Sequence, residues 1–231
     1  MKRVRTPAYL LRLSPFGESD AVATFLTEET GKVSAIARGA KRSTKRFGGA
    51  LEPMHLLAIE YEDRGKELVT LKEASLLRTR LGLTGSLEAL EAAGTGLRWT
   101  RALCPARTPE PDAFAALTDL LDGVDAGGPP RATLAAFGLQ LLVATGFGLA
   151  LDECVQCGRP CPPDRPACVD VARGGIVCMD CGGARVVVDK QVRAKAARAA
   201  KGEPVDFTPS EAEAAIRLVE LGLAAHAEVE S

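Results

Sequence analysis

Residues 21–38, AVATFLTEETGKVSAIAR, decide the fold of the N-terminal part of the chain. Two runs within it, 21–27 and 32–38, have the apolar and β-branched composition that favours strands. Glu29, Thr30 and Gly31 stand between them as a short polar break that ends on a glycine, which is typical of a turn. The stretch therefore predicts a β-hairpin.

Strand-like runs also lie on either side of this hairpin, at residues 5–13, 55–61 and 67–71. Breaks rich in Gly, Pro and Asp separate them. Five short strands without the spacing of βαβ units indicate a small antiparallel barrel or sandwich. A five-stranded OB-type β-barrel over residues 1–80 is one natural solution.

The hydrophobic period changes to that of a helix after Ser86, which has the position of an N-cap. Pro129 and Pro130 open another helical run, and the sequence TPSE at residues 208–211 has the form of a capping box. We expect residues 81–148 plus 190–231 to form a helical bundle, with the last helix packed on the middle ones. The predicted fold class is α+β with several units.

Composition limits the function classes. Hydrophobic residues make up 46% and charged residues 26% of the 231 positions, and no run is apolar over the ~20 residues of a membrane span. Polar residues interrupt the apolar stretch that a signal peptide would need at the N-terminus. We expect a cytoplasmic protein without a membrane contact, whose seven cysteines bind metal or stay free instead of forming disulfides.

Cysteines mark residues 149–189, a segment rich in Cys, Gly and Pro that has too few large apolar residues to build its own core. Cys154 and Cys157 form one C-x-x-C-G knuckle, and Cys178 and Cys181 form a second one about 20 residues later. This spacing predicts an inserted four-cysteine segment that holds a structural Zn²⁺ in a closed tetrahedral site. Two redox C-x-x-C pairs or a disulfide pattern are the alternatives. Outside the knuckles we expect two free thiols, Cys161 and Cys168, and one buried thiol, Cys104.

A basic loop, residues 37–49, follows the second strand of the predicted hairpin. Residues 32–46 contain six cations and no acid, although the formal net charge of the chain is −1. Cations on a loop beside a barrel can bind a phosphate backbone, so this loop predicts nucleic-acid binding; a solvated loop is the alternative. Aromatic residues are scarce, and only Phe47, Tyr9, Tyr61 and Trp99 stand out as candidates for base stacking. The candidate DNA-binding residues are Arg38, Lys41, Arg42, Lys45 and Arg46.

Other polar residues give weaker signals. A run of cations at residues 190–201 predicts a helix with a solvated basic face. The chain has two histidines, and its sequence contains neither a nucleophile-and-base pattern nor a phosphate-binding glycine motif. We therefore expect a binding protein and not an enzyme.

The order of these features resembles the RecO family of bacterial recombination mediators over essentially the whole chain. Residues 26–42, LTEETGKVSAIARGAKR, carry the most specific likeness, and residues 51–53 and 67–68 fit the strands that follow. The end of the basic loop, STKR at residues 43–46, departs from the family pattern of a basic residue, Ser and Arg. The resemblance implies an OB-fold, a helical domain and a zinc segment that bind single- and double-stranded DNA. It also implies action with RecR and single-strand-binding protein in strand annealing and RecA loading.

Two other functions fit the residues alone. A zinc-containing module of transcription or ribosome assembly would bind RNA or protein through the same features. A thiol oxidoreductase would use one C-x-x-C pair and would be free of metal when purified.

Overall fold

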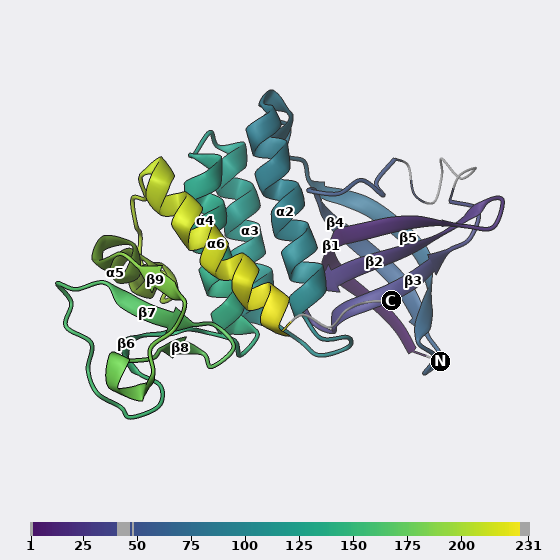
Figure 1. The fold of residues 1–231 in the computed structure, drawn as a ribbon. Coiled ribbons are helices and arrows are strands. Elements are labelled where there is room, and N and C mark those ends of the chain that lie inside the picture. Colours follow the sequence, from purple (N-terminus) through teal and green to yellow (C-terminus); the bar gives the residue numbers. More distant parts are fainter. Residues whose placement is uncertain (1, 41–46, 48, 227–231) are drawn as a thin grey trace.

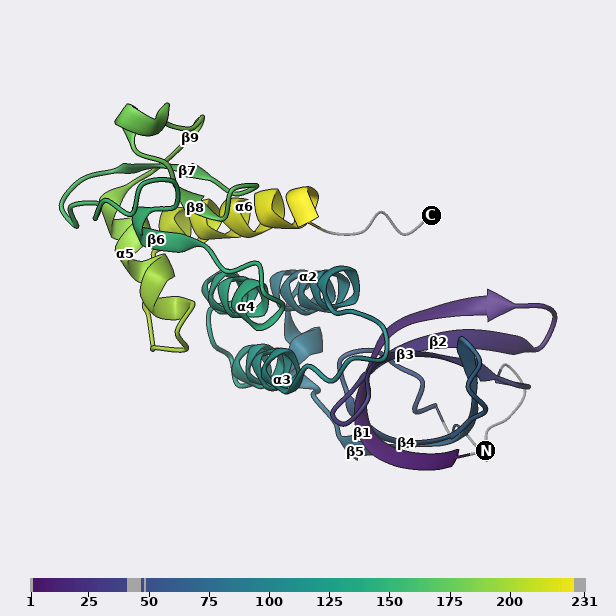
Figure 2. The ribbon, with the colours of Figure 1, turned by 90° about the horizontal axis from the view of Figure 1, so that it is seen from below.

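The computed structural model describes residues 2–40, 47 and 49–226. A β-barrel, a group of helices and a small sheet follow one another across the molecule, and the helices lie between the other two (Figure 1; Figure 2). This arrangement places the two candidate functional regions on different sides of the helices.

The N-terminal strands close into a barrel in the order β1-β2-β3-β5-β4. All neighbouring strands are antiparallel except β3 and β5, which are parallel. The predicted hairpin and the OB-type barrel are confirmed, with Thr27 opposite Gly31 at the turn. The strands are β1 (Lys2–Phe16), β2 (Asp20–Thr27), β3 (Gly31–Ala37), β4 (Leu56–Asp63) and β5 (Leu68–Arg78).

Helices form where the sequence changes period. Ser86 caps the first of them, since its Oγ accepts the N–H of Ala89 at 3.1 Å. The predicted capping box is reciprocal: Thr208 Oγ1 accepts the N–H of Glu211, and Glu211 Oε2 accepts the N–H of Thr208. The last helix packs on α4, as expected. The bounds are α2 (Leu87–Leu103), α3 (Pro111–Asp125), α4 (Pro130–Ala144) and α6 (Pro209–His226).

None of the helices in the described ranges has both the length and the apolar character needed to cross a membrane.

A buried arginine joins the barrel to the helices. The side chain of Arg80 is fully buried, and its Nε donates to Asp122 Oδ1 on α3 at 2.7 Å. The other guanidinium nitrogens donate at 3.0 Å to the Met54 carbonyl and to the Tyr9 hydroxyl of the barrel. One side chain thus binds two barrel segments and a helix, which fixes the barrel against the helices.

The cysteine-rich segment contains a four-stranded sheet in the order β6-β8-β7-β9. The sequence did not predict these strands, because they are very short and stand among Gly, Pro and Cys. Their apolar side chains, together with helix α5 (Lys190–Ala199), join the core of the helical part. The strands are β6 (Ala150–Cys154), β7 (Ala167–Asp170), β8 (Gly175–Ile176) and β9 (Val186–Val188).

Candidate functional site

The structure brings the four knuckle cysteines together. The sulfur atoms of Cys154, Cys157, Cys178 and Cys181 all lie within 4.8 Å of one another. The Sγ atoms of Cys157 and Cys178 are 3.8 Å apart. A tetrahedral ion bonded to four sulfurs at about 2.3 Å holds them about 3.8 Å apart, so the observed spacing fits such an ion.

Local backbone structure positions these sulfurs. Strand β6 ends at Cys154 beside Ile176 of β8, which is followed after one residue by Cys178, so the parallel strand pair sets the knuckles side by side. Each knuckle closes on a glycine with positive φ, +70° at Gly158 and +99° at Gly182. A residue with a Cβ rarely adopts this left-handed conformation, which explains why a glycine ends each C-x-x-C-G knuckle.

The thiols of the cluster differ in acidity. The backbone N–H of Cys178 donates to the Cys154 sulfur at 3.3 Å and lowers the pKa of Cys154 to about 6. Hydrogen bonds with neighbouring cysteine sulfurs, first with Cys178, raise the pKa of Cys181 to about 12. Four thiolates at this spacing repel one another, and a divalent cation among them removes that repulsion. The cluster can therefore hold a metal ion with all four positions taken by protein.

The remaining cysteines lie outside this cluster, and none of the described cysteines forms a disulfide. Cys104 is buried, and the loss of water contact raises its pKa to about 12. Cys161 contacts the guanidinium of Arg193, and the Cys168 sulfur lies 3.9 Å from that of Met179. The expected free and buried thiols are confirmed.

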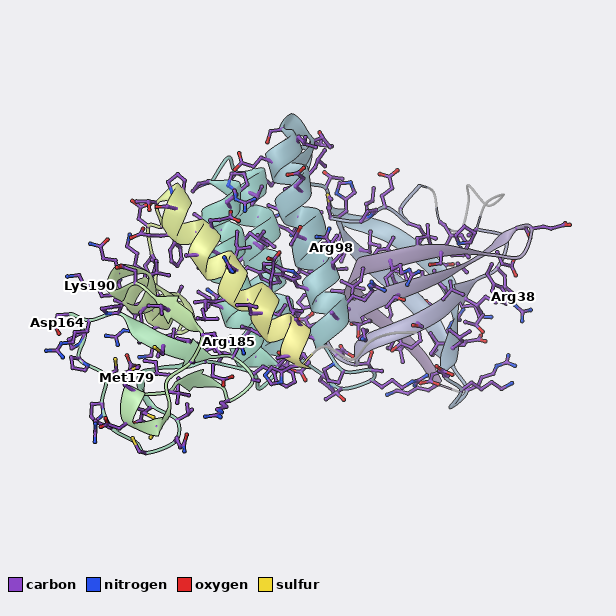
Figure 3. The ribbon with its side chains drawn as sticks, viewed as in Figure 1. Arg38, Arg98, Asp164, Met179, Arg185 and Lys190 are labelled. Atoms are coloured by element: carbon purple, nitrogen blue, oxygen red, sulfur yellow. The ribbon has the colours of Figure 1, made fainter. Side chains whose placement is uncertain are left out.

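The basic loop begins on the outer edge of the barrel. Arg38 is exposed directly after β3, and its side chain lies at the barrel end of the molecule (Figure 3). The N–H of Gly39 donates to Asp20 Oδ1 at 2.7 Å, which ties the start of the loop to the β1–β2 hairpin. The other candidate DNA-binding residues, Lys41, Arg42, Lys45 and Arg46, lie outside the described residues.

The predicted solvated basic face on α5 is wrong for part of its length. Arg193 is 4% exposed and donates to the Cys161 sulfur and the Pro162 carbonyl. Lys195 donates to Glu211 at 2.5 Å. These two cations bind the cysteine segment and α6, because the basic residues of α5 do not all lie on its outer face.

The aromatic residues that the sequence suggested for base stacking present little surface to solvent in the described structure. Tyr9, Phe47, Tyr61 and Trp99 are all buried. Phe16, at the tip of the β1–β2 hairpin, is 51% exposed, and it was not named from the sequence as a candidate for base stacking. Its position next to Gly17 in a turn was the sequence signal that could have indicated its exposure.

The cysteine cluster and the start of the basic loop lie far apart. Met179, inside the second knuckle, and Arg38 stand at opposite ends of the molecule, with the helices between them (Figure 3). The cluster therefore does not contact the described start of the basic loop at Arg38.

Comparisons with known proteins agree with this geometry. Family profiles match residues 1–80, "Recombination protein O N terminal", and residues 85–230, "Recombination protein O C terminal". A DNA repair protein RecO of Anaeromyxobacter sp. (strain K) is 42% identical over 182 residues, which cover 78% of this chain and 71% of the relative. The DNA repair protein RecO of Geobacter metallireducens is 32% identical over 229 residues, which cover 98% of this chain and 93% of the relative. That of Myxococcus xanthus is 34% identical over 182 residues.

Proposed function

Because the chain belongs to the RecO family of DNA repair proteins, we propose that it binds DNA, promotes the annealing of complementary strands and, with RecR, loads RecA. The DNA in the loading step is single-stranded and coated by single-strand-binding protein. The observation that carries this proposal is the match of both family profiles, which together span residues 1–80 and 85–230. The function needs no catalytic group, since base pairing itself supplies the free energy of annealing.

The basic loop is the proposed DNA contact, on single and double strands, through Arg38, Lys41, Arg42, Lys45 and Arg46. The exposure of Arg38 on the barrel edge and the absence of acids from residues 32–46 support it. Cations at one surface reduce the repulsion between two phosphate backbones and release counterions, which lets complementary strands approach.

Strand annealing by the purified full chain tests the proposal. If all five cations bind single-stranded DNA, log K falls with log salt at a slope of about −3 to −4. Charge reversal at Arg38, Lys41 and Arg42 should slow annealing and flatten this slope. The matched control reverses three exposed cations near the cysteine segment, Arg165, Arg185 and Lys190. Equal annealing by wild type and the loop variant would remove the basic loop from the mechanism.

The metal bound by Cys154, Cys157, Cys178 and Cys181 is proposed to be zinc with a structural role. Four thiolate ligands leave no open position for water or substrate, so the ion holds the segment folded. In this scheme residues 1–80 form the barrel unit, 81–148 plus 190–231 the helical unit and 149–189 the zinc segment. Thiolate ligands require a reducing compartment, which is consistent with action in the cytoplasm.

A further inference from the structure

The small sheet of the cysteine-rich segment has one covered edge and one open edge. On the β6 side, Cys154 N–H donates to the Arg159 carbonyl at 2.9 Å. Cys161 N–H donates to the Asp152 carbonyl at 2.8 Å, so the chain after the first knuckle covers that edge. On the other side β9 comes last in the strand order, and among the described strands only β7 pairs with it. An open edge of this kind can accept a further strand.

The backbone groups of Val187, the middle residue of β9, point out of this open edge. Val177 N–H donates to the Cys168 carbonyl at 2.9 Å, so the N–H and C=O of Cys168 face the β8 side of β7. Cys168 stands opposite Val187 in the antiparallel pair of β7 and β9. Two opposite residues in such a pair either bond with each other or both point away, so Val187 directs its N–H and C=O away from β7. The described backbone bonds leave both groups without a partner.

The side chains on the outer face of β9 form a charge pattern that complements itself. Arg185, Val187 and Asp189 are exposed and alternate with the more buried Val186 and Val188, so the three share one face. If two copies of β9 pair as antiparallel strands centred on Val187, Arg185 of each copy stands opposite Asp189 of the other. Two pairs of opposite charges then flank one pair of valines, and opposite charges at such positions stabilise a strand pair.

An apolar surface continues beside Val187. Cys168 lies directly opposite Val187, so their side chains share the outer face of the sheet. The sulfur of Met179 lies 3.9 Å from that of Cys168. Met179 is 76% exposed and Val187 is 66% exposed, and large apolar side chains gathered at a surface mark an interaction site. A second copy would place the same apolar residues on the other side of the strand pair.

We infer that two copies of the chain form a dimer through β9, in which the two strands pair antiparallel about a two-fold axis at Val187. The N–H of Val187 in each copy donates to the Val187 carbonyl of the other, and Arg185 of each copy binds Asp189 of the other. Strands of three residues bury little surface, so the dimer is weak and exchanges readily. The small sheet lies at the end of the molecule opposite the barrel (Figure 1), so the dimer leaves both barrels uncovered.

Sedimentation velocity of the full chain from about 1 µM to about 1 mM tests the dimer, since weak pairs form in this range. Wild type should pass from monomer to dimer as its concentration rises. Arg185→Glu and Asp189→Lys each place like charges at both ends of the strand pair, so each should raise the Kd of the dimer by about ten-fold or more. An equal mixture of these two variants should regain the dimer, because each pair in the mixed dimer again joins opposite charges. The double variant Arg185→Glu/Asp189→Lys should dimerise for the same reason.

Arg165→Glu is the matched control, because it reverses an exposed cation of the same segment outside β9 and should keep the wild-type Kd. Asp189 also caps α5 by accepting Gln191 N–H at 2.7 Å, so thermal melting must show that Asp189→Lys is folded. Wild type that stays monomeric up to about 1 mM would overturn the inference. A mixture that stays monomeric, or a control that weakens the dimer as much as Arg185→Glu, would also overturn it. Because the barrels stay uncovered, none of these variants should change the salt slope of DNA binding, so the two proposals fail separately.

Discussion

Replacement of Asp122 by Asn should loosen the junction between the barrel and the helices. The substitution keeps the size of the side chain and an oxygen that can accept from Arg80 Nε, and it removes the negative charge. The guanidinium of Arg80 then remains fully buried, and the described groups that accept its other hydrogen bonds are the uncharged Met54 carbonyl and Tyr9 hydroxyl. The variant therefore tests the carboxylate charge, which Arg80 shares with Arg78.

The size of the effect follows from burial. Removal of one partner from a buried ion pair costs about 3–5 kcal/mol, because the other charge is left without compensation. The Asp122 side chain is 26% exposed, so water screens part of its charge and we expect about 3 kcal/mol. With a urea dependence of about 3 kcal/mol per M, the unfolding midpoint should fall by about 1 M.

Urea unfolding followed by circular dichroism measures this midpoint. Arg78→Met is the control, since Arg78 donates to the same carboxylate at 2.5 Å while 55% of its side chain is exposed. An exposed pair contributes about 1 kcal/mol or less, so this control should shift the midpoint by about 0.3 M or less. If Asp122→Asn shifts the midpoint no more than Arg78→Met, the buried guanidinium does not hold the barrel on the helices.

Three further predictions concern the other parts of the fold. Wild type should contain about one zinc per chain, and Cys157→Ser should lose this zinc and melt about 5 °C or more lower. The control Cys168→Ser, whose cysteine lies outside the cluster, should keep the metal. Elemental analysis measures the zinc content, and thermal melting measures the loss of stability. Gly31→Ala should cost about 2 kcal/mol or more in urea unfolding, because φ is +71° and a Cβ would lie 1.8 Å from the Thr108 oxygen; Gly17→Ala, at φ +61° with open space, should cost about 1 kcal/mol. The hydrogen bond from Lys195, with that from Thr208 N–H, lowers the pKa of Glu211 below its usual 4.5. The extra unfolding free energy of wild type over Glu211→Gln should therefore be complete above pH 4.5 and should vanish as the pH falls through the lowered pKa of the folded state. A constant difference in unfolding free energy across this pH range would contradict the contact between Lys195 and Glu211.

Local signals in the sequence were sufficient for most of the barrel and the helices. Turn residues and apolar, β-branched composition placed the hairpin within one residue of β2 and β3. The fifth strand was predicted only to residue 71, whereas β5 extends to Arg78, which lies opposite Leu56 of β4. That extension depends on a partner strand distant in the sequence, so local composition does not reveal it.

In the candidate site too, the features that depend on local sequence were predicted, and those that depend on distant contacts were not. Spacing within each C-x-x-C-G knuckle is local, and the sequence identified all four members of the cluster. Burial depends on the whole fold, which explains why Tyr9 was considered for stacking although it lies in the core, and why Arg193 was placed on a solvated face. Phe16 was overlooked because a hairpin tip has no hydrophobic period of its own.

The cysteine cluster lies at the opposite end of the molecule from the start of the basic loop, so loss of the metal should not change how the loop binds DNA. The segment that carries the cluster contacts helix α6 at one end, where His226 Nε2 lies 3.2 Å from the Val171 carbonyl oxygen. The start of the basic loop is fixed to the β1–β2 hairpin of the barrel by the hydrogen bond from Gly39 N–H to Asp20 Oδ1. Cys157→Ser should therefore leave the salt slope of DNA binding at its wild-type value even where the melting temperature falls. A slope flattened as strongly as in the Arg38, Lys41 and Arg42 charge-reversal variant would mean that the metal segment itself contacts the phosphates.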